Sequence, residues 1–122
     1  MLPDYSIPIP ILRSFDETKA REFYVGFLEF QIDFEHRFEP GAPLFMQISR
    51  GACVINLSEH FGDACPGSTL RIRTDVDALV ARLSAKAYKY SRPGPPVLTS
   101  WGTKEETIRD PFANKLTFYE LV

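Results

Sequence analysis

A repeated element, a short amphipathic helix with a cap at its N-terminus, sets the strongest limit on how this chain folds. Segments from about Phe15 to Leu28 and from about Asp75 to Ala87 carry apolar residues at i, i+3 and i+4 spacing. Ser14–Glu17 and Thr74–Asp77 each resemble a capping box, in which two side chains satisfy free N–H groups of the first turn. The boxes start 60 residues apart in a chain of 122. This spacing predicts a duplicated supersecondary unit.

Strands are predicted on both sides of each helix. They cover Ile7–Ile11, Phe30–Phe38, Leu44–Ser49 and Cys53–Ser58 in the first half, and Ser68–Arg73, Tyr88–Tyr90, Lys104–Arg109 and Lys115–Leu121 in the second half. The resulting order is βαβββ, twice. We therefore expect an α+β fold with two βαβββ modules, at about residues 5–58 and 67–122, within a single domain that spans residues 1–122.

The first predicted strand contains Pro8 and Pro10, which alternate with isoleucines. Proline has no N–H to donate to a neighbouring strand, so it is confined to sheet edges and to segments with free N–H groups. This strand should therefore pair on one side at most, or reach across to another subunit. The strand Phe30–Phe38 alternates strictly between apolar and polar residues, which predicts a half-buried strand.

Composition excludes several classes of protein. A formal net charge of -2 offers no basic footprint for nucleic acid. No stretch approaches the ~20 apolar residues of a membrane span, and the first residues lack the basic and apolar regions of a signal peptide. Two cysteines, Cys53 and Cys65, do not make a disulfide framework. We expect a cytoplasmic globular protein without nucleic-acid or membrane partners.

Four motifs resemble those of a known superfamily. Phe23–Phe30 is similar to the signature "FYxxxLGF", and Arg109–Asn114 is similar to the turn "DPxGN". Ser100–Gly102, followed by that turn, resembles the "PWG" ending of bleomycin resistance proteins, and Ile9–Leu12 resembles their first strand "VPVL". The chain therefore resembles the glyoxalase/bleomycin resistance protein/dioxygenase superfamily, also called vicinal oxygen chelate, along nearly its whole length.

The chain departs from the family pattern at two turns. Glu29 and Ala113 stand where the family usually has glycine. If the left-handed backbone is kept there, a residue with a Cβ costs on the order of 1 kcal/mol. Both residues suggest locally altered turns.

The resemblance implies that each module curls into a half-shell and that two half-shells enclose a cavity. In the enzymes of the family this cavity holds a divalent metal, bound by His and Glu side chains. Three of the corresponding positions fall at about Ile9, Thr69 and Thr117, which are poor ligands, and only Glu59 could serve at the fourth. A metal site needs three or four converging ligands. We therefore expect no metal and no other cofactor.

The resemblance also implies a ligand. Bleomycin resistance proteins sequester a flat, cationic antibiotic in two clefts at a dimer interface, by aromatic stacking and by attraction to carboxylates. By this resemblance the leading hypothesis is a homodimer with an exchanged N-terminal strand, which sequesters such an antibiotic without turnover. The candidate ligand-binding residues are Trp101, Gly102, Phe34, Phe38, Glu59 and His60.

Each candidate also has a purely structural explanation. Trp101 could pack on its own loop, alternation alone would place Phe34 and Phe38 in the core, and a loop that contains His60 and Asp63 is usually just solvated. Asp33, Glu35 and Glu39 could supply negative charge to a ligand, or could simply form a solvated strand face. Two other functions stay open, namely a metal-dependent lyase, isomerase or dioxygenase of the same fold, and a module that binds a cellular metabolite. No catalytic residue is predicted.

Overall fold

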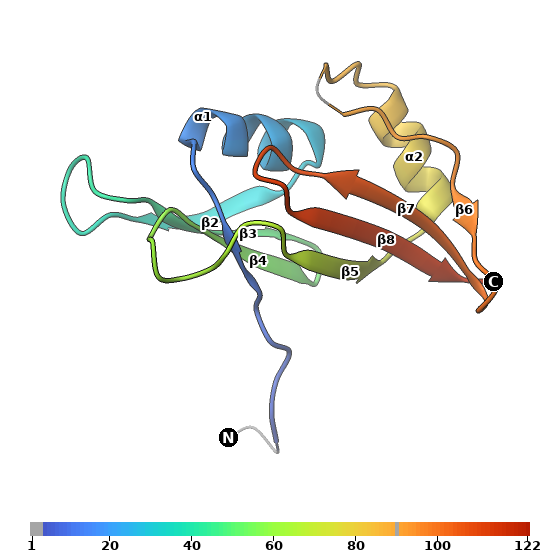
Figure 1. Cartoon of the computed structure of the whole chain (residues 1–122), viewed down its shortest axis with the longest axis horizontal. Coiled ribbons are helices and arrows are strands. Elements are labelled where there is room, and N and C mark those ends of the chain that lie inside the picture. Colours follow the sequence, from blue (N-terminus) through green and yellow to red (C-terminus); the bar gives the residue numbers. More distant parts are fainter. Residues whose placement is uncertain (1–3, 90) are drawn as a thin grey trace.

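The computed structural model describes residues 4–89 and 91–122, and it contains two four-stranded sheets, each covered on one face by a helix (Figure 1). The N-terminal sheet has the strand order β1-β4-β3-β2, and the C-terminal sheet has the order β5-β8-β7-β6. In the N-terminal half the elements are β1 (Ile11–Arg13), α1 (Glu17–Ala20), η1 (Arg21–Phe27), β2 (Gln31–His36), β3 (Phe45–Arg50) and β4 (Cys53–Ser58). In the C-terminal half they are β5 (Thr69–Arg73), α2 (Val76–Ser84), β6 (Val97–Leu98), β7 (Thr103–Arg109) and β8 (Lys115–Leu121).

Both sheets have the same topology. The first strand of each module lies parallel to the last one, as β1 with β4 and β5 with β8, and the other pairs are antiparallel. A helix connects the first strand to the other three in each case. The predicted α+β fold with two βαβββ modules is therefore confirmed.

Both helices begin at an aspartate rather than at the predicted capping boxes. Asp16 accepts a hydrogen bond from the Lys19 N–H at 2.9 Å, and Asp75 accepts one from the Ala78 N–H at 3.1 Å. The predicted cap Ser14 lies two residues too early and is buried. An aspartate placed nearer the first turn caps as well as serine or threonine does, so the boxes were wrong by one or two residues. The first helix continues from α1 as a π-helix, η1.

A bulge in β2 breaks the alternation that the sequence shows. Ile32 pairs with Ile48 and Phe34 pairs with Gln47, so Asp33 is the extra residue. Ile48 is buried under the helix, whereas Gln47 lies on the opposite face. Ile32 therefore packs against the core while Phe34, two residues later, lies on the face that no helix covers. The prediction that Phe30–Phe38 presents a single apolar face was wrong.

Two predicted strands differ in position. The first strand starts later than predicted, as β1 (Ile11–Arg13), and residues 4–10 form an arm that extends from the body of the molecule (Figure 1). The arm is tied to the sheet at its end, where the Pro10 carbonyl accepts a hydrogen bond from the Asn56 N–H at 2.9 Å. Tyr5 and Ile7 on this arm are 99% and 77% exposed. Tyr88 belongs to no strand and stacks on Phe27 instead, and Tyr90 lies outside the described residues. The fourth strand of the C-terminal sheet is instead β6 (Val97–Leu98), which follows the proline cluster.

A buried hydrogen-bond network joins the two modules. The Tyr24 hydroxyl, from the first helix, donates to Asp110 Oδ2 at 2.6 Å. Asp110 also accepts from the backbone N–H groups of Phe112 and Asn114 and from the Asn114 side chain, each at 2.8 Å. The same Asn114 amide donates to the Arg13 carbonyl at 3.0 Å. The turn between β7 and β8 is thus fixed to β1 and to the first helix.

Glu29 and Ala113 keep the left-handed backbone, with φ of 62° and 69°. The suggestion that these turns are altered was therefore wrong, because the fold keeps the turn geometry and accepts the steric cost of a Cβ. No helix among residues 4–89 and 91–122 is long and apolar enough to cross a membrane.

Candidate ligand-binding site

The face of the N-terminal sheet that no helix covers presents an aromatic ring beside a carboxylate. Phe34 is 47% exposed and stacks against Phe45, with 6.4 Å between the ring centroids. Asp33 accepts hydrogen bonds from Ser49 Oγ at 2.8 Å, from Gln47 Nε2 at 3.1 Å and from Gln31 Nε2 at 3.2 Å. These bonds, from Gln47 and Ser49 above all, lower the pKa of Asp33. All three donors are neutral, so Asp33 is a fixed negative charge that its donors do not neutralise.

Phe38 and His60 lie together at the end of the same sheet. They line a cavity of about 240 Å³ with His36, Phe45 and Asp63. Phe38 makes edge-on contacts with both imidazoles, at centroid distances of 4.7 Å to His36 and 5.7 Å to His60. Phe38 is 79% exposed, so it is not a core residue. This corner offers aromatic surface and the Asp63 carboxylate, which accepts a hydrogen bond from Ser58 at 2.6 Å.

The side chain of Glu59, the last candidate in this half, is hydrogen-bonded to the backbone of Leu44. Its Oε1 accepts a hydrogen bond from the Leu44 N–H at 2.8 Å, and its own N–H donates to the Leu44 carbonyl at 2.9 Å. The side chain therefore fixes the start of β3. A role for Glu59 in holding a ligand would require this bond to break.

Trp101 and Gly102 lie in the tight turn between β6 and β7. Thr99 and Thr103 close this turn by hydrogen bonds from Thr99 N to Thr103 O and from Thr103 N to Thr99 Oγ1. Gly102 has φ of 89°, which favours glycine, and the turn holds Trp101 outward with 70% of its surface exposed. Trp101 is therefore exposed rather than packed on its own loop.

Beside Trp101 lies an ordered carboxylate that sequence reasoning missed. Glu105 accepts hydrogen bonds from Arg71 Nη2 at 2.8 Å and from Thr103 Oγ1 at 2.7 Å. These two, with a third from the Trp101 side chain, lower the pKa of Glu105 to about 2. The Arg71 guanidinium also lies over the Tyr119 ring, 4.6 Å from its centroid. No sequence signal marks this group, because its members come from β5, β7 and β8.

The two groups of candidates lie at opposite ends of one chain. The turn that carries Trp101 is next to the C-terminus in Figure 1, whereas β2 and the β2–β3 hairpin are at the other end of the molecule. One chain therefore does not bring Trp101 and Phe34 into a single cleft. Both sheets leave their uncovered faces open, and a cleft with both groups requires a second copy.

The residues at the family's metal positions do not fit a metal. Among residues 4–89 and 91–122, no three His, Cys, Asp or Glu side chains lie close enough to hold one ion. Thr117 makes a hydrogen bond with Thr107 at 2.9 Å, and Ile9 has no donor atom in its side chain. The Phe38 ring contacts both imidazoles, His36 and His60.

Comparison with known proteins gives the same fold. An antibiotic-binding protein, TnmS3, from Streptomyces sp. CB03234 is 20% identical with a TM-score of 0.74, and each chain is covered completely. A bleomycin-binding protein solved with bleomycin is 21% identical with a TM-score of 0.73, over 97% of this chain and 100% of the other. The bleomycin resistance determinant of transposon Tn5 is 20% identical with a TM-score of 0.71, over 96% and 98%.

Identities at this level show the fold and leave the ligand open. Among curated proteins, none is similar enough in sequence to count as a match. The family model described as "Glyoxalase superfamily protein" matches residues 4–122. The chain therefore belongs to the glyoxalase superfamily.

Proposed function

We propose that this protein binds and sequesters a small aromatic cation of the bleomycin type, in two equal clefts of a homodimer. Each cleft would form between the N-terminal sheet of one copy and the C-terminal sheet of the other. The observation that carries this proposal is the pair of open sheet faces, one with Phe34 beside Asp33 and the other with Trp101 beside Glu105. Exposed apolar surface that is rimmed by polar residues is typical of ligand-binding grooves and interaction sites.

The charges on these faces favour a cationic ligand. Asp33 is held by neutral donors alone, so a cation over Phe34 would meet both the ring face and an unneutralised carboxylate. Cation–π and stacking contacts contribute roughly 0.5–2 kcal/mol each. Glu105 contributes less net charge because Arg71 is bound to it. The N-terminal sheet should therefore bind the cationic part of the ligand, and Trp101 should stack on its flat part.

The exposure of the arm of residues 4–10 supports the proposal that a second copy is present. Tyr5 and Ile7 are almost fully exposed on their own chain, and large apolar side chains of this kind are stabilised by burial against a partner. We propose that the arm exchanges between the two subunits. A two-fold dimer places each arm on the other copy and forms two identical interfaces.

Trp101, the single tryptophan, reports on binding directly. We expect metal-free and copper-loaded bleomycin to quench its fluorescence at micromolar concentrations. The Phe34→Ala variant should bind at least about tenfold more weakly, as the loss of one aromatic anchor predicts. Phe61→Ala is the comparison variant, because Phe61 is 93% exposed and lies in the loop after β4, outside the Phe34–Asp33 and Trp101–Glu105 groups. Absence of quenching at these concentrations would reject the drug and leave the fold intact.

A mixing experiment separates a shared cleft from a cleft within one chain. Phe34→Ala and Trp101→Ala copies are each expected to lose binding, as measured by calorimetry. In a mixed dimer, one cleft receives both defects and the other receives the intact Phe34 and Trp101. Equilibrated mixtures should therefore regain about a quarter of the full binding capacity, since half of the dimers are mixed. If mixing restores nothing, the clefts are not shared between subunits.

We further propose that the protein acts in the cytoplasm. Support comes from two unpaired cysteines, Cys53 and Cys65, of which Cys65 is exposed. Exposed thiols are typical of reducing compartments. The retention of both free thiols in protein isolated from its host, measured by mass spectrometry, tests this point.

A further inference from the structure

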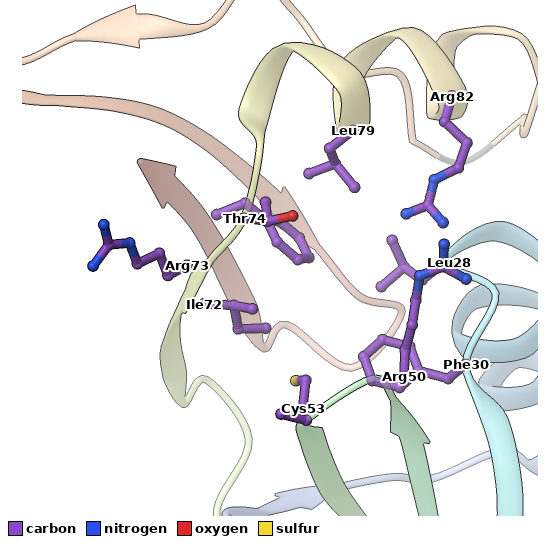
Figure 2. Close-up of a pocket in the computed structure, with 11 residues that line it drawn as sticks. Leu28, Phe30, Arg50, Cys53, Ile72, Arg73, Thr74, Leu79 and Arg82 are labelled. Carbon is purple, nitrogen blue, oxygen red and sulfur yellow. The ribbon is translucent and has the colours of Figure 1, made fainter. Parts of the chain in front are cut away.

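We propose that a second cavity, at the junction of the two modules and away from the open faces, binds a small organic carboxylate with a short apolar tail. The cavity has a volume of about 210 Å³. It lies between the end of β3, the loop before β2 and the helix α2, so both modules contribute to its wall (Figure 2). This proposal does not rest on the function proposed above.

The floor of the cavity is apolar. Leu28 and Phe30 come from the N-terminal module, and Leu79 and Phe118 come from the C-terminal module, with Ile72 beside them. The first four are at most 6% exposed, so their positions are fixed by the core. An aliphatic chain or a single aromatic ring would bury its surface on this floor and gain roughly 25 cal/mol for each Å² removed from water.

The lining holds three arginines and no acidic residue. Arg50 and Arg82 point toward one another at one side of the cavity, whereas Arg73 points away from it (Figure 2). Two guanidinium groups that face one another repel unless an anion lies between them. The carboxylate that partly meets this need is Glu29, which lies 2.7 Å from Arg82, 3.0 Å from Lys86 and 3.9 Å from Arg50.

Glu29 leaves this cluster with an excess of positive charge. Three cations face one carboxylate, so two positive charges are not neutralised. Arg50 donates from one terminal nitrogen to the Glu29 backbone carbonyl, and Arg82 donates from one terminal nitrogen to the Glu29 carboxylate. A guanidinium has five N–H donors, so both side chains keep most of theirs for another acceptor. Arginine pairs with carboxylates in forked geometry, which matches the planar carboxylate of an organic acid.

Charge and floor together define the ligand class. A free inorganic anion would meet the arginines but gain nothing from Phe118 and Leu79. A neutral alcohol would gain from the floor but leave the excess charge as it is. A chain such as octanoate satisfies both, and the cavity volume limits the tail to a short chain or one ring.

The test is a titration of the full-length protein with octanoate, followed by methyl NMR and calorimetry. We expect saturable shifts at the methyl groups of Leu28, Ile72 and Leu79, with a Kd on the order of 1 mM or lower for a ligand of this size. The methyl groups of Val54, on the open face of the N-terminal sheet, should not move. 1-Octanol and sulfate are the two comparison probes, and each should bind at least ~10-fold more weakly.

Three variants complete the test. Arg50→Gln and Arg82→Gln should each weaken octanoate binding at least ~10-fold, the value for one lost charge-assisted bond. Arg73→Gln is the matched control, since its side chain points away, and should leave the affinity within about twofold. Arg50 and Arg82 belong to different modules, so a folding defect in one variant leaves the other as the test. Equal binding of octanol or of sulfate, shifts confined to Val54, or an equal effect of Arg73→Gln would each overturn the proposal.

Discussion

Removal of one hydroxyl group should reveal how strongly the two modules are joined. Tyr24 is fully buried, and its hydroxyl makes a 2.6 Å hydrogen bond to Asp110, which is itself 5% exposed. The Tyr24→Phe variant keeps the ring and its packing but leaves a buried carboxylate with one donor fewer. Hydrogen bonds to charged groups contribute about 1.5–3 kcal/mol. We expect a loss of that size in the free energy of unfolding.

Urea and thermal unfolding, followed by circular dichroism at a fixed protein concentration, measure this loss. For a chain of this length, about 1 kcal/mol corresponds to roughly 4 °C, so Tm should fall by about 6–12 °C. Tyr5→Phe is the matched control: it removes a tyrosine hydroxyl from the arm but keeps the ring that would pack on a second copy, and it should change Tm by less than about 1 °C. A loss below about 0.5 kcal/mol in Tyr24→Phe would refute the reasoning, because the module junction would then not depend on this bond.

The same pair predicts a dependence on alkaline pH. Burial, followed by the charge of Asp110 and the hydrogen bond to it, raises the pKa of Tyr24 well above 10. The folded protein therefore holds this proton more tightly than the unfolded chain does. As the pH rises above 10, unfolded chains lose the proton first and stability falls. Tyr24→Phe should lose less stability over that range than the wild type does.

Four further results are expected. Burial raises the pKa of Glu106, which accepts a hydrogen bond from the Gly94 N–H at 3.0 Å, so the folded form binds this proton more tightly than the unfolded chain does. Glu106→Gln should therefore raise Tm at pH 7, and the gain should disappear in acid, where both states of the wild type are protonated. An unchanged Tm at pH 7 would contradict this. Ala113→Gly relieves a left-handed backbone and should add about 0.5–1 kcal/mol in urea unfolding, whereas a loss would show that the turn carries no strain. Deletion of residues 1–10 should shift the sedimentation coefficient toward that of a monomer, and an unchanged dimer would exclude arm exchange. Elemental analysis after dialysis should find Ni, Zn, Mn and Fe well below one equivalent per chain, and a stoichiometric metal would restore the enzyme hypothesis.

The sequence predicts the repeated architecture well because strand and helix periodicities are strong in both halves. The bounds of β4 and β8 coincide with their predicted ranges, Cys53–Ser58 and Lys115–Leu121. The caps were displaced because several residues before each helix can accept the same N–H, and only the backbone decides between them. The strand Val97–Leu98 was missed because it has two residues and follows a cluster of prolines, which indicates a loop.

The candidate site was predicted only in part, for a different reason. Exposed aromatic residues such as Trp101 and Phe38 could be named from motifs and spacing. Gln47, which donates to Asp33, and Arg71, which donates to Glu105, come from other strands of the same sheets, so no local pattern records these bonds. The structural role of Glu59, which is to hold the Leu44 N–H, is equally invisible in sequence. Pairing between strands, rather than residue type, decided which carboxylates remain available to a ligand.

The bulge at Asp33 also affects how this surface can change in evolution. It separates Phe30 and Ile32, which pack against the core, from Phe34 and the β2 residues after it, which are exposed. Loss or gain of one residue at the bulge reverses which side chains enter the open face, while Ile32 keeps its place against Ile48. A descendant of this protein could therefore acquire a new ligand preference through a single-codon deletion or insertion, without substitution of any core residue.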